Sequence, residues 1–238
     1  MAKGVKARLD GHQFDLQALT ELFREGDPTV AKDADNFYLT SEELDGLWSD
    51  PTELLSTAQS LLLRVNGTAR ILHGGSYRPV ELRGHFTDEM GKTQVFLQPH
   101  SAEIRMSAGT VVLSTNGEQP ATPRPQGPQY LSKIADNRAV AEVLEILGKP
   151  VPALDWFDLY KVFEIIRHAV GDEGAIKANE WASSTEINKF RESANRREIS
   201  GSDARHARLP GSPSGRSMSI NEGREFIRRL AKAWLDSL

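Results

Sequence analysis

Four prolines within nine residues, near the middle of the chain, most constrain how this sequence can fold. They lie in the segment TNGEQPATPRPQGPQY at Pro120, Pro123, Pro125 and Pro128. Proline at this density favours extended polyproline-like backbone and disfavours both helix and sheet, because each ring fixes φ and removes an amide donor. We therefore predict a linker over residues 119–129. It would separate a mixed α/β domain with an antiparallel sheet (residues 1–118) from a helical bundle (residues 130–238).

Before the linker, the sequence changes from a helical to an alternating pattern. Apolar residues recur at helical spacing in FDLQALTELFREGDP and in DPTELLSTAQSLLLRV, and the second helix is predicted to end at Asn66–Gly67. A short strand is predicted at FYLT. From about residue 68, alternation of apolar and polar residues predicts an antiparallel meander of about five half-buried strands. These strands are ARILH, RPVELRGHFT, TQVFLQ, AEIRMS and TVVLS.

After the linker, four segments have the apolar period of amphipathic helices. They are DNRAVAEVLEILG, LDWFDLYKVFEIIRHAVG, NEWASSTEINKFRESAN and SINEGREFIRRLAKAWLDSL. In the last segment, Ser219 and Glu222 have the spacing of a capping box. Four helices with mostly short connections predict a bundle. The fold class expected is therefore α+β, with N-terminal helices plus an antiparallel β-meander and a C-terminal helical bundle.

Composition excludes several classes of site. The 238-residue chain has no cysteine, which excludes disulfides, thiolate zinc sites and cysteine nucleophiles. Phosphate-binding loops, dinucleotide-binding glycine motifs and His-Glu-x-x-His are missing, so we expect no metal and no cofactor. The N-terminus lacks the apolar stretch of a secretory signal, and no run approaches 18 apolar residues. We expect a cytoplasmic protein that does not enter a membrane.

Charge is unevenly distributed along the chain. The net charge is −4, but residues 187–232 hold 11 Lys and Arg against 5 Asp and Glu, whereas the remainder holds 18 against 28. Such asymmetry is typical of a nucleic-acid-binding face on an acidic protein. It is equally typical of arginines that pair with the acidic N-terminal part of the same chain.

The most distinctive stretch is FRESANRREISGSDARHAR, residues 190–208. Arginine makes planar, permanently charged contacts to phosphate, and histidine transfers protons near neutral pH. Together they are a minimal set for metal-independent RNA cleavage. The candidate catalytic residues are His206, Arg197 and Asn195. The candidate nucleic-acid-binding residues are Arg191, Arg196, Arg205 and Arg208.

The same stretch also has a purely structural interpretation. Asn195, Ser200 and Asp203 can cap helix ends, and Gly201 can take a left-handed turn. The arginines would then hold the polar loop, residues 198–218, to an acidic part of the chain. The sequence leaves both interpretations open.

A helical bundle whose third helix runs into an Arg/Asn…His segment resembles the HEPN family, over the C-terminal half only. That resemblance implies a domain of four to five helices, usually dimeric, of the kind found in bacterial toxins, toxin–antitoxin pairs and phage-defence proteins. Many members are metal-independent ribonucleases, marked by an arginine, a polar residue and a histidine after four to six intervening positions. The family pattern would fall on Asn195, Arg197 and His206. Here eight residues separate Arg197 from His206, and they include Gly201.

Two functions follow from these observations. The two-part layout and the lack of a complete catalytic set favour a non-catalytic binding or regulatory protein. It would have a sensing N-terminal domain and a helical domain that forms a homodimer, with RNA or another protein as partner. The resemblance implies bacterial stress or phage defence as the setting. The alternative is a metal-independent HEPN-type endoribonuclease that uses an Arg/His pair.

Overall fold

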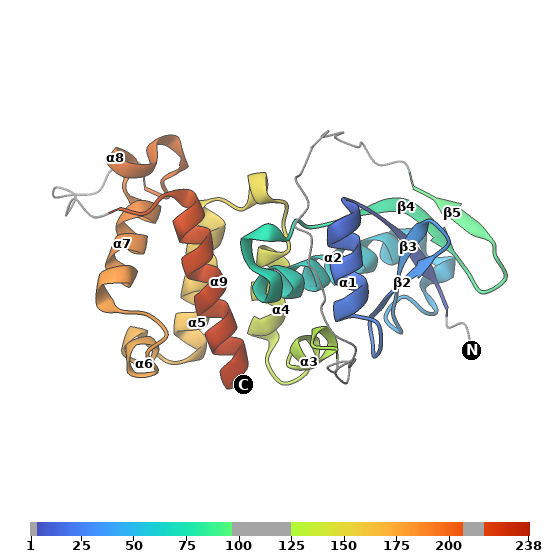
Figure 1. Ribbon diagram of the computed structural model, residues 1–238, viewed down its shortest axis with the longest axis horizontal. Coiled ribbons are helices and arrows are strands. Elements are labelled where there is room, and N and C mark those ends of the chain that lie inside the picture. Colours follow the sequence, from blue (N-terminus) through green and yellow to red (C-terminus); the bar gives the residue numbers. More distant parts are fainter. Residues whose placement is uncertain (1–3, 97–124, 207–216) are drawn as a thin grey trace, which may run out of the picture.

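The computed structural model describes residues 4–96, 125–206 and 217–238. Within these ranges the chain has an α+β fold, which confirms the predicted class. A five-stranded antiparallel sheet lies at one end and a group of helices lies at the other, with the long helix α2 (Pro51–His73) between them (Figure 1).

The sheet is antiparallel throughout, but its strand order differs from that of a meander. Its order is β2-β3-β1-β4-β5. The first strand along the chain was not predicted, because KARLD carries only two apolar residues between charged ones. It occupies the centre of the sheet, flanked by the β2–β3 and β4–β5 hairpins. The strands are β1 (Lys6–Asp10), β2 (Thr29–Asp33), β3 (Asn36–Thr40), β4 (Glu81–Thr87) and β5 (Thr93–Val95).

One face of the sheet belongs to the core. Ala7 pairs with Leu39 on one side and with Phe86 on the other, and all three side chains are fully buried. The helices α1 (Gln13–Leu22) and α2 contact the sheet and share its buried cluster. The opposite face is partly exposed and carries Arg8 opposite Tyr38. This is the arrangement expected of an antiparallel sheet with one solvated face.

The prediction that the second helix ends at Asn66–Gly67 is wrong, and so is the strand predicted at ARILH, because α2 continues to His73. The Asn66 side chain accepts hydrogen bonds from the Tyr77 hydroxyl and the Val80 amide, and it donates to the Val80 carbonyl. Burial raises the pKa of Tyr77. Asn66 therefore does not end the helix. Its side chain anchors the segment that leads into β4.

Gly67 has a packing role in the middle of α2. A Cβ atom at this position would lie 2.1 Å from the carbonyl oxygen of Leu144, in helix α4 (Arg138–Leu147). Gly148, which follows α4, is equally close to the opposite helix, since its Cβ would lie 1.9 Å from the Leu63 oxygen. The two helices cross at a distance that only glycine permits at these positions.

Other predicted strands have mixed outcomes. The prediction at FYLT is confirmed by β3, and those at RPVELRGHFT and TQVFLQ are confirmed in part by β4 and β5. The segments AEIRMS and TVVLS lie outside the described residues.

The predicted C-terminal helices are confirmed by α4, α5 (Trp156–Ala169), α7 (Ser184–Asn195) and α9 (Ile220–Ser237). Capping boxes begin both α7 and α9, through Ser183–Glu186 and Ser219–Glu222. The bundle is centred on Phe190, whose ring lies between 5.0 and 6.1 Å from four other aromatic rings. These rings belong to Trp156, Tyr160, Phe163 and Phe226. The remaining helices are α3 (Gly127–Ser132), α6 (Glu173–Ala178) and the single turn α8 (Arg197–Ser200).

The predicted linker is described only in part. Residues 119–124 lie outside the described ranges, while Gly127 begins the short helix α3 with Pro128 in its first turn, where a missing amide hydrogen costs nothing. One buried cluster includes residues from before and after the linker, and α2 contacts both α4 and α9. The division into two domains stays a prediction.

None of the helices within the described ranges is both long and apolar enough to span a bilayer.

We expect Gly67→Ala to lower the free energy of unfolding by about 1–3 kcal/mol, because the new methyl group meets the backbone of α4. Alanine's higher helix propensity, worth up to ~1 kcal/mol, offsets only part of this loss. Urea unfolding followed by circular dichroism measures the difference. Gly75→Ala is the matched control, since a Cβ there meets open space. Equal stability of the two variants would contradict the proposed role of the crossing.

Candidate functional site

The basic stretch identified in the sequence folds back onto the last turn of α7. The Ser193 carbonyl accepts a hydrogen bond from the Ser200 hydroxyl, and the Ala194 carbonyl accepts one from the Arg205 amide. The hydroxyl of Ser193, which is fully buried, accepts a third from the amide of Met218 at 2.7 Å. The chain before residue 206 and the chain after residue 216 are therefore both attached to one turn of helix.

Arg205 makes several contacts with other parts of the chain. Its guanidinium carbon lies 3.8 Å from the centroid of the Tyr160 ring and 5.8 Å from that of Phe157. One of its nitrogens donates to Asn195 at 3.1 Å, and another lies 3.9 Å from the carboxylate of Glu164. A planar cation stacked on an aromatic face is a stabilising arrangement that lysine cannot reproduce.

Two further arginines of the stretch make ion pairs within the chain. Arg191 bonds to Glu173 of α6 at 3.2 Å, and Arg196 lies 3.9 Å from Glu192, one turn earlier on α7. These contacts are of the kind that the structural interpretation of the sequence predicts. Gly201 also has a positive φ of 61°.

The remaining predicted site residues are Arg197, His206, Asn195 and Arg208. Arg197 and His206 are both exposed, at the two ends of the segment that contains α8. Asn195 is brought together with Arg205, the arginine that directly precedes the histidine. Arg208 lies outside the described residues. The catalytic and nucleic-acid-binding roles stay predictions.

The structure adds α5 residues that the sequence did not single out. Phe157 is 60% exposed, although it is a large apolar side chain. The signal was present, because Phe157 falls outside the apolar stripe that its neighbours Trp156 and Tyr160 share. Lys161 and Glu164 follow Phe157 at helical spacings of four and seven, so they lie on the same side of α5. We call Phe157, Lys161, Glu164 and Arg205 the α5 surface.

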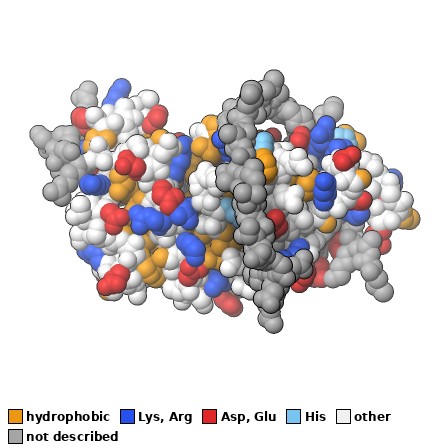
Figure 2. All heavy atoms as spheres, in the orientation of Figure 1, with side chains coloured by type: hydrophobic (Ala, Val, Ile, Leu, Met, Phe, Trp, Pro, Cys, Tyr) orange, Lys and Arg blue, Asp and Glu red, His pale blue; other side chains and the backbone are white. Residues whose placement is uncertain are grey.

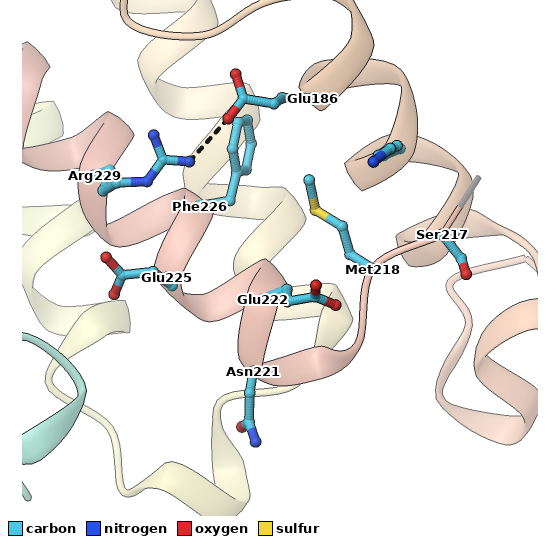
Figure 3. A pocket seen from close by; sticks show the side chains of 9 residues that line it. Glu186, Ser217, Met218, Asn221, Glu222, Glu225, Phe226 and Arg229 are labelled. Atoms are coloured by element: carbon cyan, nitrogen blue, oxygen red, sulfur yellow. Dashed lines mark hydrogen bonds and ion pairs between the residues drawn. The ribbon is translucent and has the colours of Figure 1, made fainter.

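A groove of about 500 Å³ lies between α7 and α9 (Figure 3). Met218 and Phe226 contribute apolar surface, and Glu186 pairs with Arg229 across it at 3.0 Å. Hydrogen bonds from Ser183 are the main cause that lowers the pKa of Glu186. Glu222 also lines the groove, and its hydrogen bonds with Ser219 lower its pKa.

The surface of the helical end carries both signs of charge. Figure 2 shows Lys and Arg side chains interspersed with Asp and Glu side chains there.

The groove has the volume of a small-molecule site. Its acidic residues are, however, already committed to helix caps and ion pairs. Sequence reasoning missed it because its walls come from two helices about thirty residues apart. Among the described residues, no group of three or more His, Asp or Glu side chains is arranged to hold a metal ion.

We expect Arg205→Ala to lower the free energy of unfolding by about 1–3 kcal/mol, because it removes a stacked cation and a charged hydrogen bond. Arg197→Ala is the matched control. It removes an exposed arginine of the same stretch, so it should change the free energy of unfolding by less than about 0.5 kcal/mol. Chemical denaturation of both variants provides the comparison. A neutral Arg205→Ala substitution would show that the segment does not depend on this clamp.

Comparison with known proteins gives no match: no protein-family model, no curated protein and no solved structure resembles this chain significantly.

Proposed function

We propose that the protein is a non-catalytic binding protein and that it contacts single-stranded RNA through the α5 surface. The observation that carries the proposal is the exposed ring of Phe157 beside the guanidinium of Arg205. Proteins that bind single-stranded nucleic acids combine aromatic rings, on which bases stack, with cations that contact phosphate.

The surroundings of Phe157 support a polyanionic partner. Lys161 is exposed on the α5 surface, and Arg205 presents its planar cation against the rings of α5. His206, the residue after Arg205, is also exposed. Residues 187–232 hold 11 Lys and Arg against 5 Asp and Glu in sequence, and three of these arginines pair with carboxylates outside that range, at Glu164, Glu173 and Glu186. Dimerisation through the C-terminal helices and a sensing role for the sheet domain are retained as parts of the same proposal.

The contacts of Arg205 give it a positioning role. Arg205 contacts Tyr160, Asn195 and Glu164. Its guanidinium therefore serves to position the chain beside Phe157, and the ring itself is left for a base.

We expect Phe157→Ala to weaken binding of a short fluorescein-labelled oligouridylate, measured by fluorescence anisotropy. Loss of one stacked base costs roughly 1–3 kcal/mol, so Kd should rise about 5- to 150-fold. Phe14→Ala is the matched control, because Phe14 is 65% exposed on α1 and should leave Kd unchanged. Equal Kd values for the two variants, or no binding by the wild type at low salt, would refute the proposal.

A second candidate function is the metal-independent ribonuclease. The exposure of both Arg197 and His206 favours it, since neither side chain is buried in a fixed structural role. Under this proposal, the purified protein cleaves single-stranded RNA in the presence of EDTA. His206→Ala should then reduce the rate at least about 100-fold, the scale of general acid–base catalysis.

The control for this experiment is His168→Ala, which removes another exposed histidine near the end of α5. Cleavage that is lost only in His206→Ala supports the nuclease. RNA that is bound but stays intact with all three proteins leaves the binding function alone. Equal cleavage by all three proteins would instead indicate a contaminating nuclease.

A further inference from the structure

Helix α9 carries charges of both signs along one exposed side, and the two signs are separated. Glu222 and Glu225 lie in the first half of the helix, whereas Arg229 and Lys232 lie in its second half. Spacings of three, four and three residues place all four on one stripe of an α-helix. The side chains of Glu225, Arg229 and Lys232 are 47%, 46% and 41% exposed. Glu222 is exposed as well, and we call these four residues the α9 stripe.

The charges of the α9 stripe face outward and keep hydrogen-bonding capacity. Helix α9 faces the viewer at the helical end in Figure 1, and Figure 2 shows acidic and basic side chains side by side there. Arg229 donates to Glu186 through Nη2 at 3.0 Å, and a guanidinium has five N–H donors. Glu225 accepts from Arg228 through both oxygens, and a carboxylate has about four acceptor positions. These contacts hold the side chains in place and leave positions for a second partner.

The order of the charges is complementary to itself when it is reversed. Positions 222 and 232, and positions 225 and 229, are both centred on Ile227. Two copies of α9 that pack antiparallel at this level therefore place Glu222 opposite the partner's Lys232. They also place Glu225 opposite the partner's Arg229, and two-fold symmetry repeats each pair. Parallel packing would instead place like charges opposite one another, which is unfavourable.

The same register supplies an apolar contact beyond each end of the α9 stripe. Residue 236 of one copy would lie opposite Met218 of the other, which lines the α7–α9 groove. Leu238 follows two residues later and is 53% exposed, so it has apolar surface to bury. Antiparallel packing therefore brings the partner's Leu238 to the groove, beside Met218.

We propose that α9 packs antiparallel against α9 of a second copy, in the register that centres both helices on Ile227. The inference rests on the homodimer of the proposed function, to which it assigns a surface, an orientation and a register. A second copy is the occupant because the stripe complements its own sequence, whereas a wholly acidic or wholly basic partner would complement only half of it. Exposed ion pairs contribute little each, so we expect a dimer that dissociates reversibly.

The test is sedimentation equilibrium of the full chain, which measures the Kd of the dimer. Glu225→Arg places like charges opposite one another at two symmetric positions, so Kd should rise at least about 100-fold. Arg229→Glu should have the same effect with the opposite sign of charge. Glu198→Lys is the matched control, because it reverses an exposed carboxylate of α8, outside the α9 stripe, and should leave Kd unchanged.

The decisive experiment mixes the two variants in equal amounts. When Glu225→Arg meets Arg229→Glu, opposite charges again face one another at both symmetric positions, so dimers should form with a Kd close to that of the wild type. The double variant should dimerise for the same reason. Misfolding of either single variant could not be reversed in this way. If Arg229→Glu does not fold, Lys232→Glu takes its place in the comparison of single variants.

Two results would overturn the proposal, and they differ in what they leave standing. A wild-type protein that stays monomeric up to about 1 mM would remove both the α9 contact and the homodimer. A wild-type dimer whose Kd is unchanged in Glu225→Arg would remove the α9 contact alone. RNA binding is a separate measurement, since none of the residues of the α9 stripe belongs to the α5 surface. Its failure beside an intact dimer would therefore leave the α9 contact standing.

Discussion

The backbone contact between α2 and the end of α4 is the constraint on which the rest of the structure depends. Gly67 meets the Leu144 carbonyl, and Gly148 meets that of Leu63, so each partner contributes one glycine to the crossing. Close approach here brings Leu147 within reach of Arg70 and places α9 against the end of α2. Any side chain at the two glycines would push apart the elements that unite the sheet and the bundle.

Most of the described arginines after residue 125 stabilise the fold through contacts with carbonyls, aromatic rings and carboxylates. Arg224 and Arg228 bond to carbonyls at the ends of other elements, which are groups that helices leave without partners. Arg205 stacks on Tyr160, and Arg229 pairs with Glu186 across two helices. Positive charge in sequence therefore overstates the positive charge offered to a partner. Arg70 of α2 is an exception. It is buried, yet its Nη2 has no hydrogen-bond partner among the described residues.

The amphipathic helices of the C-terminal half could be predicted because local signals and packing agree in them. Ser219 and Glu222 show this agreement, since their spacing predicted a capping box and the structure contains one. Prediction failed at Asn66–Gly67 and at ARILH, where local preference and tertiary contact disagree. An asparagine bonded to Tyr77 and a glycine packed on α4 have no signature that distinguishes them from a helix end. The central strand β1 escaped detection because two buried apolar residues, Ala7 and Leu9, are too few to establish a period.

The candidate site shows the same limit. Residue types indicated the stretch 190–208, but they could not indicate that Arg205, and not Arg197, would contact Asn195, because the stacking partner Tyr160 lies 45 residues away.

The attachment of two chain segments to one turn of α7 has a consequence for the length of the chain between them. Arg205 bonds to Ala194 and Met218 bonds to Ser193, so these two described residues are held at neighbouring points of α7. For a connection whose ends are fixed side by side, doubling its length costs only about 0.6 kcal/mol of closure entropy. The bundle can thus accept a longer segment, or an entire inserted domain, at this position without rearranging its core.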